Sequence, residues 1–275
     1  MRRTRDARVT AKLAALLSAV LLLCPAWPAS AAPSPGEGQQ STLGNDISWP
    51  QCDKPFPADQ AFAIVGVNNG LANNTNPCLR EQLEWGETSS GITPQPKVSL
   101  YVNTANPGSS GSWWPTSNEY PILSAVRNPY GSCEENDYGK ACAYMYGYAK
   151  AYDDAYIRGI TNPSDYFWWL DVETENSWST TDKDANRTVL EGMTDFFHSI
   201  DVKGVGIYST GLQWGRIVGT VSSSSNLYSL PSWLAGARSV TGAKANCSDP
   251  PLTDGGEVVL TQFVSRKFDY NHSCD

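Results

Sequence analysis

The sequence has few charged residues, very little histidine and no long hydrophobic run. Of its 275 residues, 17% are charged, and the two histidines are His198 and His272. With 40% hydrophobic residues, such a chain is typical of a globular protein rather than a disordered one. No Cys-x-x-Cys pair and no glycine-rich phosphate-binding motif occurs. We therefore expect no metal site and no cofactor.

Positive charge is scarce outside the N-terminus. The net charge is −8, although the first 12 residues contribute +4, from Arg2, Arg3, Arg5, Arg8 and Lys12 against Asp6. The rest of the chain therefore carries −12. Nucleic-acid binding needs clustered Lys and Arg, so we expect no nucleic acid as a partner.

The basic start precedes an apolar stretch, Leu13–Cys24, and then Ala29-Ser30-Ala31. This order predicts a secretory signal peptide over residues 1–31, cleaved after Ala31. The apolar stretch is shorter than the about 20 residues that span a bilayer, which disfavours the alternative of an uncleaved anchor. A bulky Leu23 before Cys24 disfavours lipoprotein processing. We expect a secreted, extracellular monomer without membrane attachment, whose residues 32–42 form a flexible leader.

Six cysteines remain after the predicted cleavage, an even number that favours three disulfides in an oxidising compartment. Fifteen pairings are possible. Because neighbours in sequence close short loops, we prefer the pairs 52–78, 133–142 and 247–274.

Short apolar runs alternate with polar or helical stretches from Leu43 onward, which predicts one domain over 43–275. Seven runs are expected to be strands, and an eighth carries Phe268-Asp269-Tyr270-Asn271. Strand and helix in repeated order favour a parallel sheet, and this number of strands favours an α/β fold of the irregular, single (β/α) TIM-like barrel type. The seven runs are Asn45–Trp49, Phe62–Asn68, Lys97–Asn103, Tyr166–Val172, Gly204–Ser209, Ser232–Ala235 and Val258–Phe263.

Two helices are predicted clearly. Ala141–Ile160 carries a tyrosine every fourth residue, from Tyr144 to Tyr156, a stripe typical of core packing. Residues 182–200 follow a Thr181/Asp184 capping-box pattern. No helix is predicted between Leu230 and Glu257.

The most informative segment is Leu170-Asp171-Val172-Glu173. Residues two apart in a strand share a face, so Asp171 and Glu173 should point the same way at the strand's C-terminal end, where barrel active sites form. The alternative is a solvated pair at the start of a loop. We expect the pKa of Glu173 to be raised by burial beside Trp169 and by the charge of Asp171. Asp46 and Asp269 lie in the first and last predicted strands and are further candidates for this rim.

Tryptophans supply flat faces on which sugar rings stack. Six lie at or near predicted strand ends and rim loops: Trp49, Trp113, Trp114, Trp178, Trp214 and Trp233. Buried core is the alternative for about half of them. Trp113 and Trp114, inside a Gly/Ser-rich loop, are the preferred candidates for the walls of a sugar subsite.

The ordered set of these segments resembles glycoside hydrolase family 25, the lysozyme-like muramidases. The resemblance covers residues 44–275 and rests on Asp46-Ile47-Ser48, Leu170-Asp171-Val172-Glu173, Gly206-Ile207-Tyr208-Ser209, Ser232-Trp233-Leu234-Ala235, Leu260-Thr261-Gln262-Phe263 and Phe268-Asp269-Tyr270-Asn271. The chain departs from the family pattern at Val67-Asn68-Asn69-Gly70, at Val102-Asn103 and at Thr261-Gln262-Phe263.

The resemblance implies an irregular (β/α) barrel that cleaves cell-wall polysaccharide, namely the β-1,4 bond between N-acetylmuramic acid and N-acetylglucosamine in peptidoglycan. Glu173 would be the general acid, and Asp171 its charged partner or the group that orients the substrate acetamido group. Substrate-binding residues would be Asp46, Asp269, Trp49, Trp113, Trp114, Tyr208 and Trp233. The alternatives are a catalytically silent, glycan-binding barrel of the cell envelope and a structural or toxin-like domain.

Overall fold

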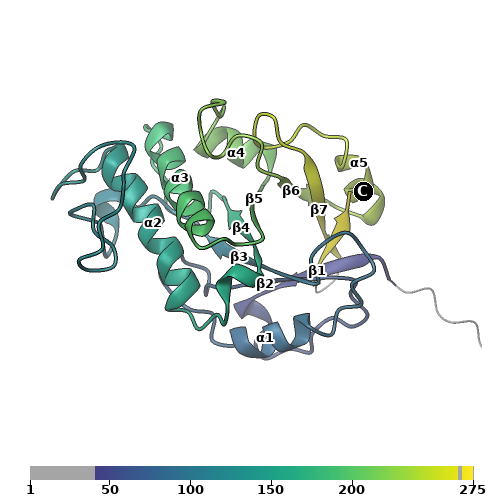
Figure 1. Ribbon diagram of the computed structural model, residues 1–275. Helices are drawn as coiled ribbons and strands as arrows, with labels where there is room; N and C mark the ends of the chain where they lie inside the picture. Colours follow the sequence, from purple (N-terminus) through teal and green to yellow (C-terminus); the bar gives the residue numbers. More distant parts are fainter. Residues whose placement is uncertain (1–40, 266–267, 275) are drawn as a thin grey trace, which may run out of the picture. The chain divides into compact units, whose positions relative to one another are not determined.

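The computed structural model describes residues 41–265 and 268–274, within a compact unit, Gln39–Asp275, whose strands close into one barrel (Figure 1). The eight strands follow one another around the barrel in chain order, which confirms the predicted irregular barrel. The predicted signal peptide, and the leader apart from Ser41 and Thr42, lie outside the described residues. The strands are β1 Leu43–Ile47, β2 Ala63–Gly66, β3 Val98–Asn103, β4 Phe167–Asp171, β5 Gly204–Ser209, β6 Ser232–Ala237, β7 Val258–Ser265 and β8 Phe268–Ser273.

The last strand corrects the prediction of a parallel sheet. Strands β1 to β7 pair in parallel with their neighbours, whereas β8 is antiparallel to both β7 and β1. Only two residues separate β7 from β8, and a parallel connection needs a crossover of about a dozen residues or more. The reversal brings the start of β8 to the rim where the parallel strands end.

Five α-helices lie in the described part of the chain, and two of them match the predicted helices within a few residues. The helix α3 begins after Asp182, whose side chain accepts a hydrogen bond from the Ala185 N–H, so the expected Thr181/Asp184 capping box is wrong. The helix α5 overturns the prediction that no helix lies between Leu230 and Glu257. The helices are α1 Leu79–Gly86, α2 Lys140–Tyr156, α3 Lys183–Ser199, α4 Gly211–Ile217 and α5 Val240–Asn246.

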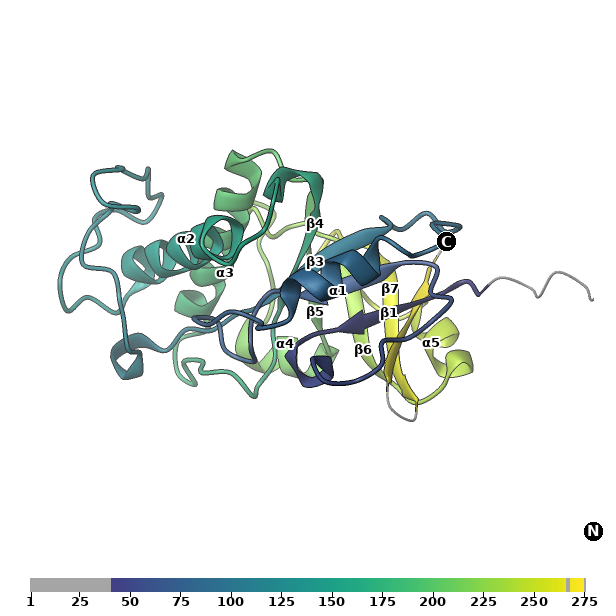
Figure 2. The same ribbon diagram turned by 90° about the horizontal axis from the view of Figure 1, so that it is seen from below.

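The helices α2 and α3 lie side by side on the outside of the barrel (Figures 1 and 2). Their backbones touch, because a Cβ atom at Gly147 would collide with the Val189 carbonyl, and one at Gly192 with the Tyr144 carbonyl. The predicted tyrosine stripe packs in this interface: Tyr148, Tyr152 and Tyr156 all set their rings edge-on to Phe196.

Strand β4 separates two hydrophobic layers. Trp168 faces outward and stacks on Phe197 of α3, whereas Trp169 faces the barrel interior against Trp233. Gly206 of β5 leaves room for Trp169, because a Cβ there would overlap the indole ring. The same alternation turns Asp171 inward at the end of the strand.

Three disulfides join Cys52 to Cys78, Cys133 to Cys142 and Cys247 to Cys274, as predicted. Among the described residues, no helix has the length and apolar character needed to cross a membrane. Within the same residues, no group of three or more His, Cys, Asp or Glu side chains could hold a metal ion.

Candidate active site

A cavity of about 420 Å³ opens at the rim where the parallel strands end, and it gathers all four predicted acids. Asp46 comes from β1, Asp171 from the end of β4, Glu173 from the loop that follows and Asp269 from the start of β8. Asp46 and Asp269 are direct partners in the β1–β8 ladder. We call this space the carboxylate cavity.

Asp46 is buried and held by two amide side chains. Its Oδ1 accepts a hydrogen bond of 2.7 Å from Asn271 Nδ2, and both of its carboxylate oxygens lie 3.1 Å from Gln262 Nε2. Gln262 in turn accepts from the Tyr208 hydroxyl at 2.8 Å. Burial, and then the charge of Asp269, raises the pKa of Asp46 to about 7 although both amides act in the opposite direction.

Asp171 is the most enclosed of the four acids, with 4% of the residue exposed. Its Oδ2 accepts a hydrogen bond of 2.8 Å from Asn103 Nδ2, while its buried Oδ1 has no hydrogen-bond partner among the described residues. Burial is the largest cause that raises its pKa well above the ordinary value, followed by the charges of Glu173 and Asp46.

Glu173 is half-buried on the loop after β4. Its backbone carbonyl accepts a hydrogen bond of 2.9 Å from Trp178 Nε1, which fixes the loop next to the carboxylates. Its pKa is raised by burial and then by the charges of Glu175 and Asp269. Burial is thus a cause, as expected, and Glu173 also repels Asp171, whose pKa its charge raises.

A chain of buried and partly buried hydrogen bonds connects Asp171 to the helix α2. The Asn103 backbone N–H donates to Asn68 Oδ1 at 2.8 Å, and Asn68 Nδ2 donates to Asp154 Oδ1 at 2.9 Å. Asp154 is fully buried, with Arg158 Nε at 3.6 Å. Sequence reasoning assigned no role to these side chains, although Asn68 and Asn103 stand at two of the departures from the family pattern.

The aromatic candidates divide between this cavity and other places. Trp49, 44% exposed, and the buried Trp233 line the carboxylate cavity together with Tyr208. Tyr101, which sequence reasoning missed, lines it too. The sequence did offer a signal, because Tyr101 lies in a predicted strand two residues before Asn103 and therefore shares its face.

Trp113 and Trp114 do not line the carboxylate cavity, although Trp113 lines a smaller pocket that also reaches Asn176. Trp114 stacks on Tyr146 of α2 with ring centroids 5.0 Å apart. Trp113 lies over the Lys150 ammonium group at 4.8 Å. Both rings therefore pack against α2, because the loop that carries them folds back onto that helix. Of the remaining tryptophans, Trp214 is buried, and Trp178 lies beside Glu173.

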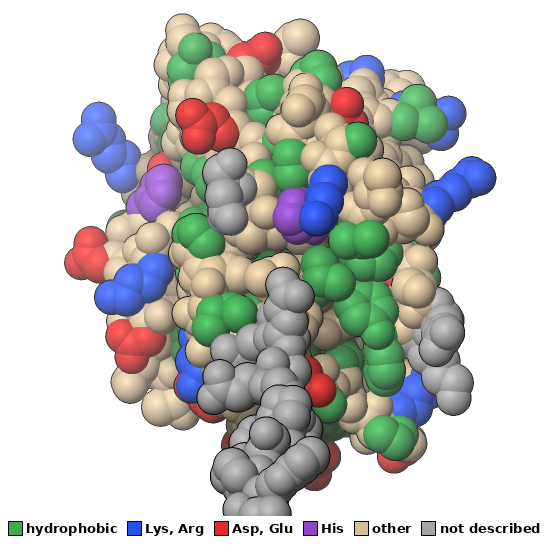
Figure 3. Space-filling view, turned by 90° about the vertical axis from the view of Figure 1, so that its right-hand side faces the viewer, with side chains coloured by type: hydrophobic (Ala, Val, Ile, Leu, Met, Phe, Trp, Pro, Cys, Tyr) green, Lys and Arg blue, Asp and Glu red, His purple; other side chains and the backbone are tan. Residues whose placement is uncertain are grey.

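Basic side chains are dispersed on the face of the molecule shown in Figure 3. Lysine and arginine side chains stand apart from one another there, among acidic and uncharged groups. That face therefore offers no continuous positive surface.

A scan of protein-family models finds no match, and neither does a search of curated proteins. Solved structures do match. A muramidase from Trichobolus zukalii is 15% identical at a TM-score of 0.50, over 85% of this chain and 93% of that one. A family GH25 lysozyme from Aspergillus fumigatus is 14% identical at a TM-score of 0.50, over 84% and 92%.

The Clostridium perfringens spore cortex lytic enzyme SleM is 14% identical at a TM-score of 0.50, and the match covers 86% of this chain and 68% of that one. These proteins share the barrel with the described chain over most of its length. The chain therefore has the fold of the family GH25 lysozymes and muramidases, the family that its segments resemble.

Proposed function

We propose that this protein is a secreted glycoside hydrolase of the muramidase type that cleaves glycosidic bonds of peptidoglycan. The observation that carries the proposal is the convergence of Asp46, Asp171, Glu173 and Asp269 in one cavity at the rim of the barrel. The shared fold with GH25 lysozymes supports it. Paired carboxyl groups in unlike environments are what acid-catalysed glycoside hydrolysis requires.

Glu173 is the proposed general acid. It is half-buried, whereas Asp46 and Asp171 are buried, so its carboxyl group can reach a bound sugar more readily. A carboxyl group with a raised pKa keeps a protonated fraction closer to neutral pH, and that proton passes to the leaving glycosidic oxygen as the bond breaks.

Asp171 is the proposed partner. Of its two implied roles, its burial favours the orientation of the substrate acetamido group, because a carboxyl group whose pKa is raised so far spends less time charged. Asn103 fixes one of its oxygens, and the unpartnered Oδ1 is free to take a hydrogen bond from the substrate. Asp46 and Asp269 line the same wall, and the exposed Trp49 ring offers a face for a sugar.

Secretion is part of the proposal. Three disulfides fit an oxidising compartment, and peptidoglycan is an extracellular polymer that such a protein would meet there. The polysaccharide is the proposed partner of a monomeric enzyme.

The test is to assay the mature protein on purified peptidoglycan and on a panel of other wall polysaccharides, beside Glu173→Gln. This substitution keeps the size of the side chain but removes its acidic proton, so turnover should fall by about 10²–10⁴ with little change in binding. Glu257→Gln is the matched control, since Glu257 is exposed just before β7, at the opposite end of the barrel.

Two results would contradict the proposal. If Glu173→Gln turned over substrate at the parental rate, Glu173 would not be the general acid. A parent protein that binds peptidoglycan but cleaves none of the polysaccharides would instead be a glycan-binding barrel.

A further inference from the structure

A second, larger cavity adjoins the carboxylate cavity. It has a volume of about 1030 Å³, and Asn176 lines both spaces, so the two meet at this residue. Its walls come from the chain after β3, from the loop between β4 and α3, and from α4. We call it the outer groove.

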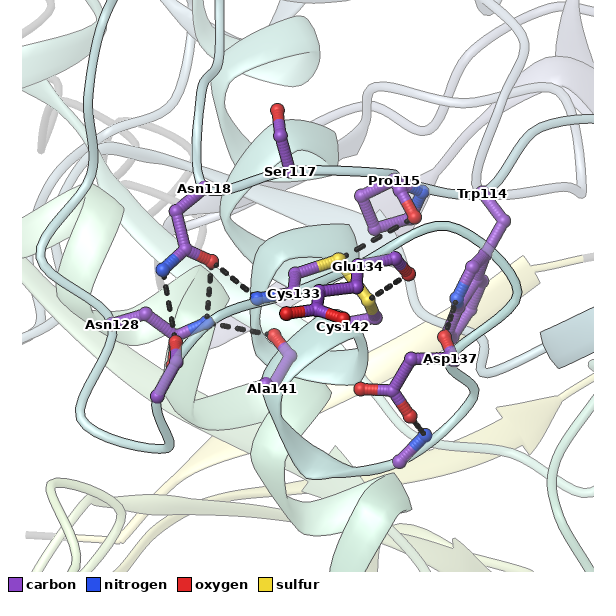
Figure 4. Close-up of a disulfide and its surroundings, with 12 residues drawn as sticks. Trp114, Pro115, Ser117, Asn118, Asn128, Cys133, Glu134, Asp137, Ala141 and Cys142 are labelled. Atoms are coloured by element: carbon purple, nitrogen blue, oxygen red, sulfur yellow. Dashed lines mark hydrogen bonds between the residues drawn. A yellow bond between two sulfur atoms is a disulfide. The ribbon is translucent and has the colours of Figure 1, made fainter.

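One wall of the outer groove belongs to a long segment, residues 104–139, that is fixed to α2. The Cys133–Cys142 disulfide ties this segment to the helix, and Asn128 Nδ2 donates to the Ala141 carbonyl at 2.8 Å (Figure 4). Trp114 Nε1 donates to the Asp137 carbonyl at 2.8 Å. These contacts hold the wall in place before any ligand arrives.

Tyr138 presents an aromatic ring from this wall. The residue lines the outer groove and is 44% exposed, while its ring packs against Trp114 with centroids 5.9 Å apart. Trp114 is itself stacked on Tyr146. Tyr138 is therefore the accessible outer ring of an aromatic stack that α2 supports.

Another part of the lining is joined to the proposed general acid. Trp178 lines the outer groove and is half-buried, and its indole N–H holds the Glu173 carbonyl. A ligand that packs against Trp178 would therefore also restrain the loop that carries Glu173.

The lining of the outer groove is chiefly uncharged and rich in hydroxyl groups. Exposed hydroxyl side chains come from Ser109, Ser110, Thr180 and Thr181, and ionisable groups with full charges are few: Asp182, Lys183 and Arg216. Aromatic faces beside hydroxyl and amide groups suit a neutral, polyhydroxylated chain.

We propose that the outer groove binds further sugar units of the polymer whose bond is cleaved at the carboxylates, with Tyr138 and Trp178 as stacking faces. This inference rests on the proposed function. It makes the protein selective for long glycan strands over short fragments, because only a strand that crosses Asn176 gains both sets of contacts.

The test compares Tyr138→Ala with Tyr138→Phe on long glycan strands and on the shortest soluble fragment that the parent cleaves. Loss of the ring should lower kcat/KM on long strands by about 5–20-fold, and by less than about twofold on the short fragment. Tyr138→Phe keeps the ring and should retain most of the parental preference. Ile122→Ala is the matched control, because Ile122 is 88% exposed on the same segment and lies outside the groove.

The outcomes separate this inference from the proposed function. Equal losses of kcat/KM on both substrates, or no loss on long strands, would contradict sugar binding in the outer groove. Either result would leave the proposed enzyme activity unaffected. If the parent cleaves nothing, the same variants are compared for binding to insoluble peptidoglycan. Weaker binding by Tyr138→Ala, but not by Tyr138→Phe or Ile122→Ala, would then support glycan binding in the outer groove even without catalysis. Unchanged binding by Tyr138→Ala would refute glycan binding there. Thermal melting of each variant identifies a loss that comes from unfolding.

Discussion

The carboxylate cavity and the outer groove adjoin at one residue but are held by different means. In the cavity, strand pairing sets the positions: Asp46 opposes Asp269, and Asp171 is the partner of both Asn103 and Tyr208. The groove is lined largely by loop residues, and its outer wall depends on a disulfide and on side chains packed against α2. The comparison indicates that three of the four acids are mounted on paired strands and Glu173 lies two residues beyond β4, whereas the proposed substrate preference depends on loops that can vary.

The two spaces also differ in charge. Among the residues that the structure describes, the cavity brings together five acidic side chains, Glu175 included, and no basic one, whereas the groove carries one acid and two bases. Acids crowded at low exposure hold protons that exposed acids release. Changes in the cavity should therefore alter turnover and pH dependence, and changes in the groove should alter the preference for chain length.

After Glu173→Gln, the largest effect is expected for Asp171→Asn. The amide oxygen can still accept the Asn103 hydrogen bond, but the carboxyl group that orients the sugar or balances its developing positive charge is lost. Turnover should fall by about 10²-fold or more on long and short substrates alike. Steady-state rates on both substrates test this. A loss of activity confined to long strands would show that Asp171 contributes to substrate binding rather than to bond cleavage. It would contradict the assignment of turnover to the carboxylate cavity and of chain-length preference to the outer groove.

A smaller effect is expected when Cys133 and Cys142 are both replaced by Ser. Loss of a short disulfide loop costs about 2–3 kcal/mol in the chain-entropy model. Because this disulfide fixes the wall of the outer groove, activity on long strands should fall several-fold while the short fragment is cleaved at close to the parental rate.

The matched control for that prediction is the double replacement of Cys247 and Cys274. This disulfide closes a longer interval and lies after the end of β8, on the rim opposite the cavity. It should lower the melting temperature at least as much without changing the ratio of long-strand to short-fragment activity. Equal ratios for the two double variants would contradict a specific role for the groove wall.

The cavity could be predicted from the sequence largely because it follows strand periodicity. The alternation around Asp171 fixes which residues face the barrel interior, and the structure has Trp169 inside and Trp168 outside, as period two requires. The strand β8 was predicted, but its antiparallel direction was missed. The signal for that direction was present, because the gap between Phe263 and Phe268 is too short for a crossover helix. The helix α5 has seven residues, too few to show a helical period.

The groove could not be predicted in the same way. A Gly/Ser-rich context marks Trp113 and Trp114 as loop residues, but it does not indicate that the loop folds back onto α2. That contact partly buries Trp114 between Tyr146 and Tyr138 and leaves the tyrosine as the accessible ring. Long-range packing of this kind has no local pattern, so Tyr138 emerged only from the structure, whereas Trp178 was already a candidate from the sequence.

The smallest effect concerns Asp154, the buried acid at the far end of the hydrogen-bond chain from Asp171. Burial raises the pKa of Asp154 to about 7, against about 3.9 in an unfolded chain. Between these values the folded protein retains a proton that the unfolded chain releases. Its contribution to stability is thus complete at low pH and is lost as the pH rises toward 7.

Asp154→Asn removes this titration while keeping an oxygen that can accept from Asn68. Part of the gain is offset, because the variant also loses the attraction between Asp154 and Arg158. The free energy of unfolding at pH 8 should therefore rise by about 1–2 kcal/mol relative to the parent, and its decline between pH 4 and 7 should become shallower. Urea titrations at several pH values measure both quantities, with the exposed Asp249→Asn as control. A decline as steep as the parental one would show that Asp154 is already ionised in the folded protein at low pH, and the remaining slope in the variant would then belong to Asp46 and its neighbours in the cavity.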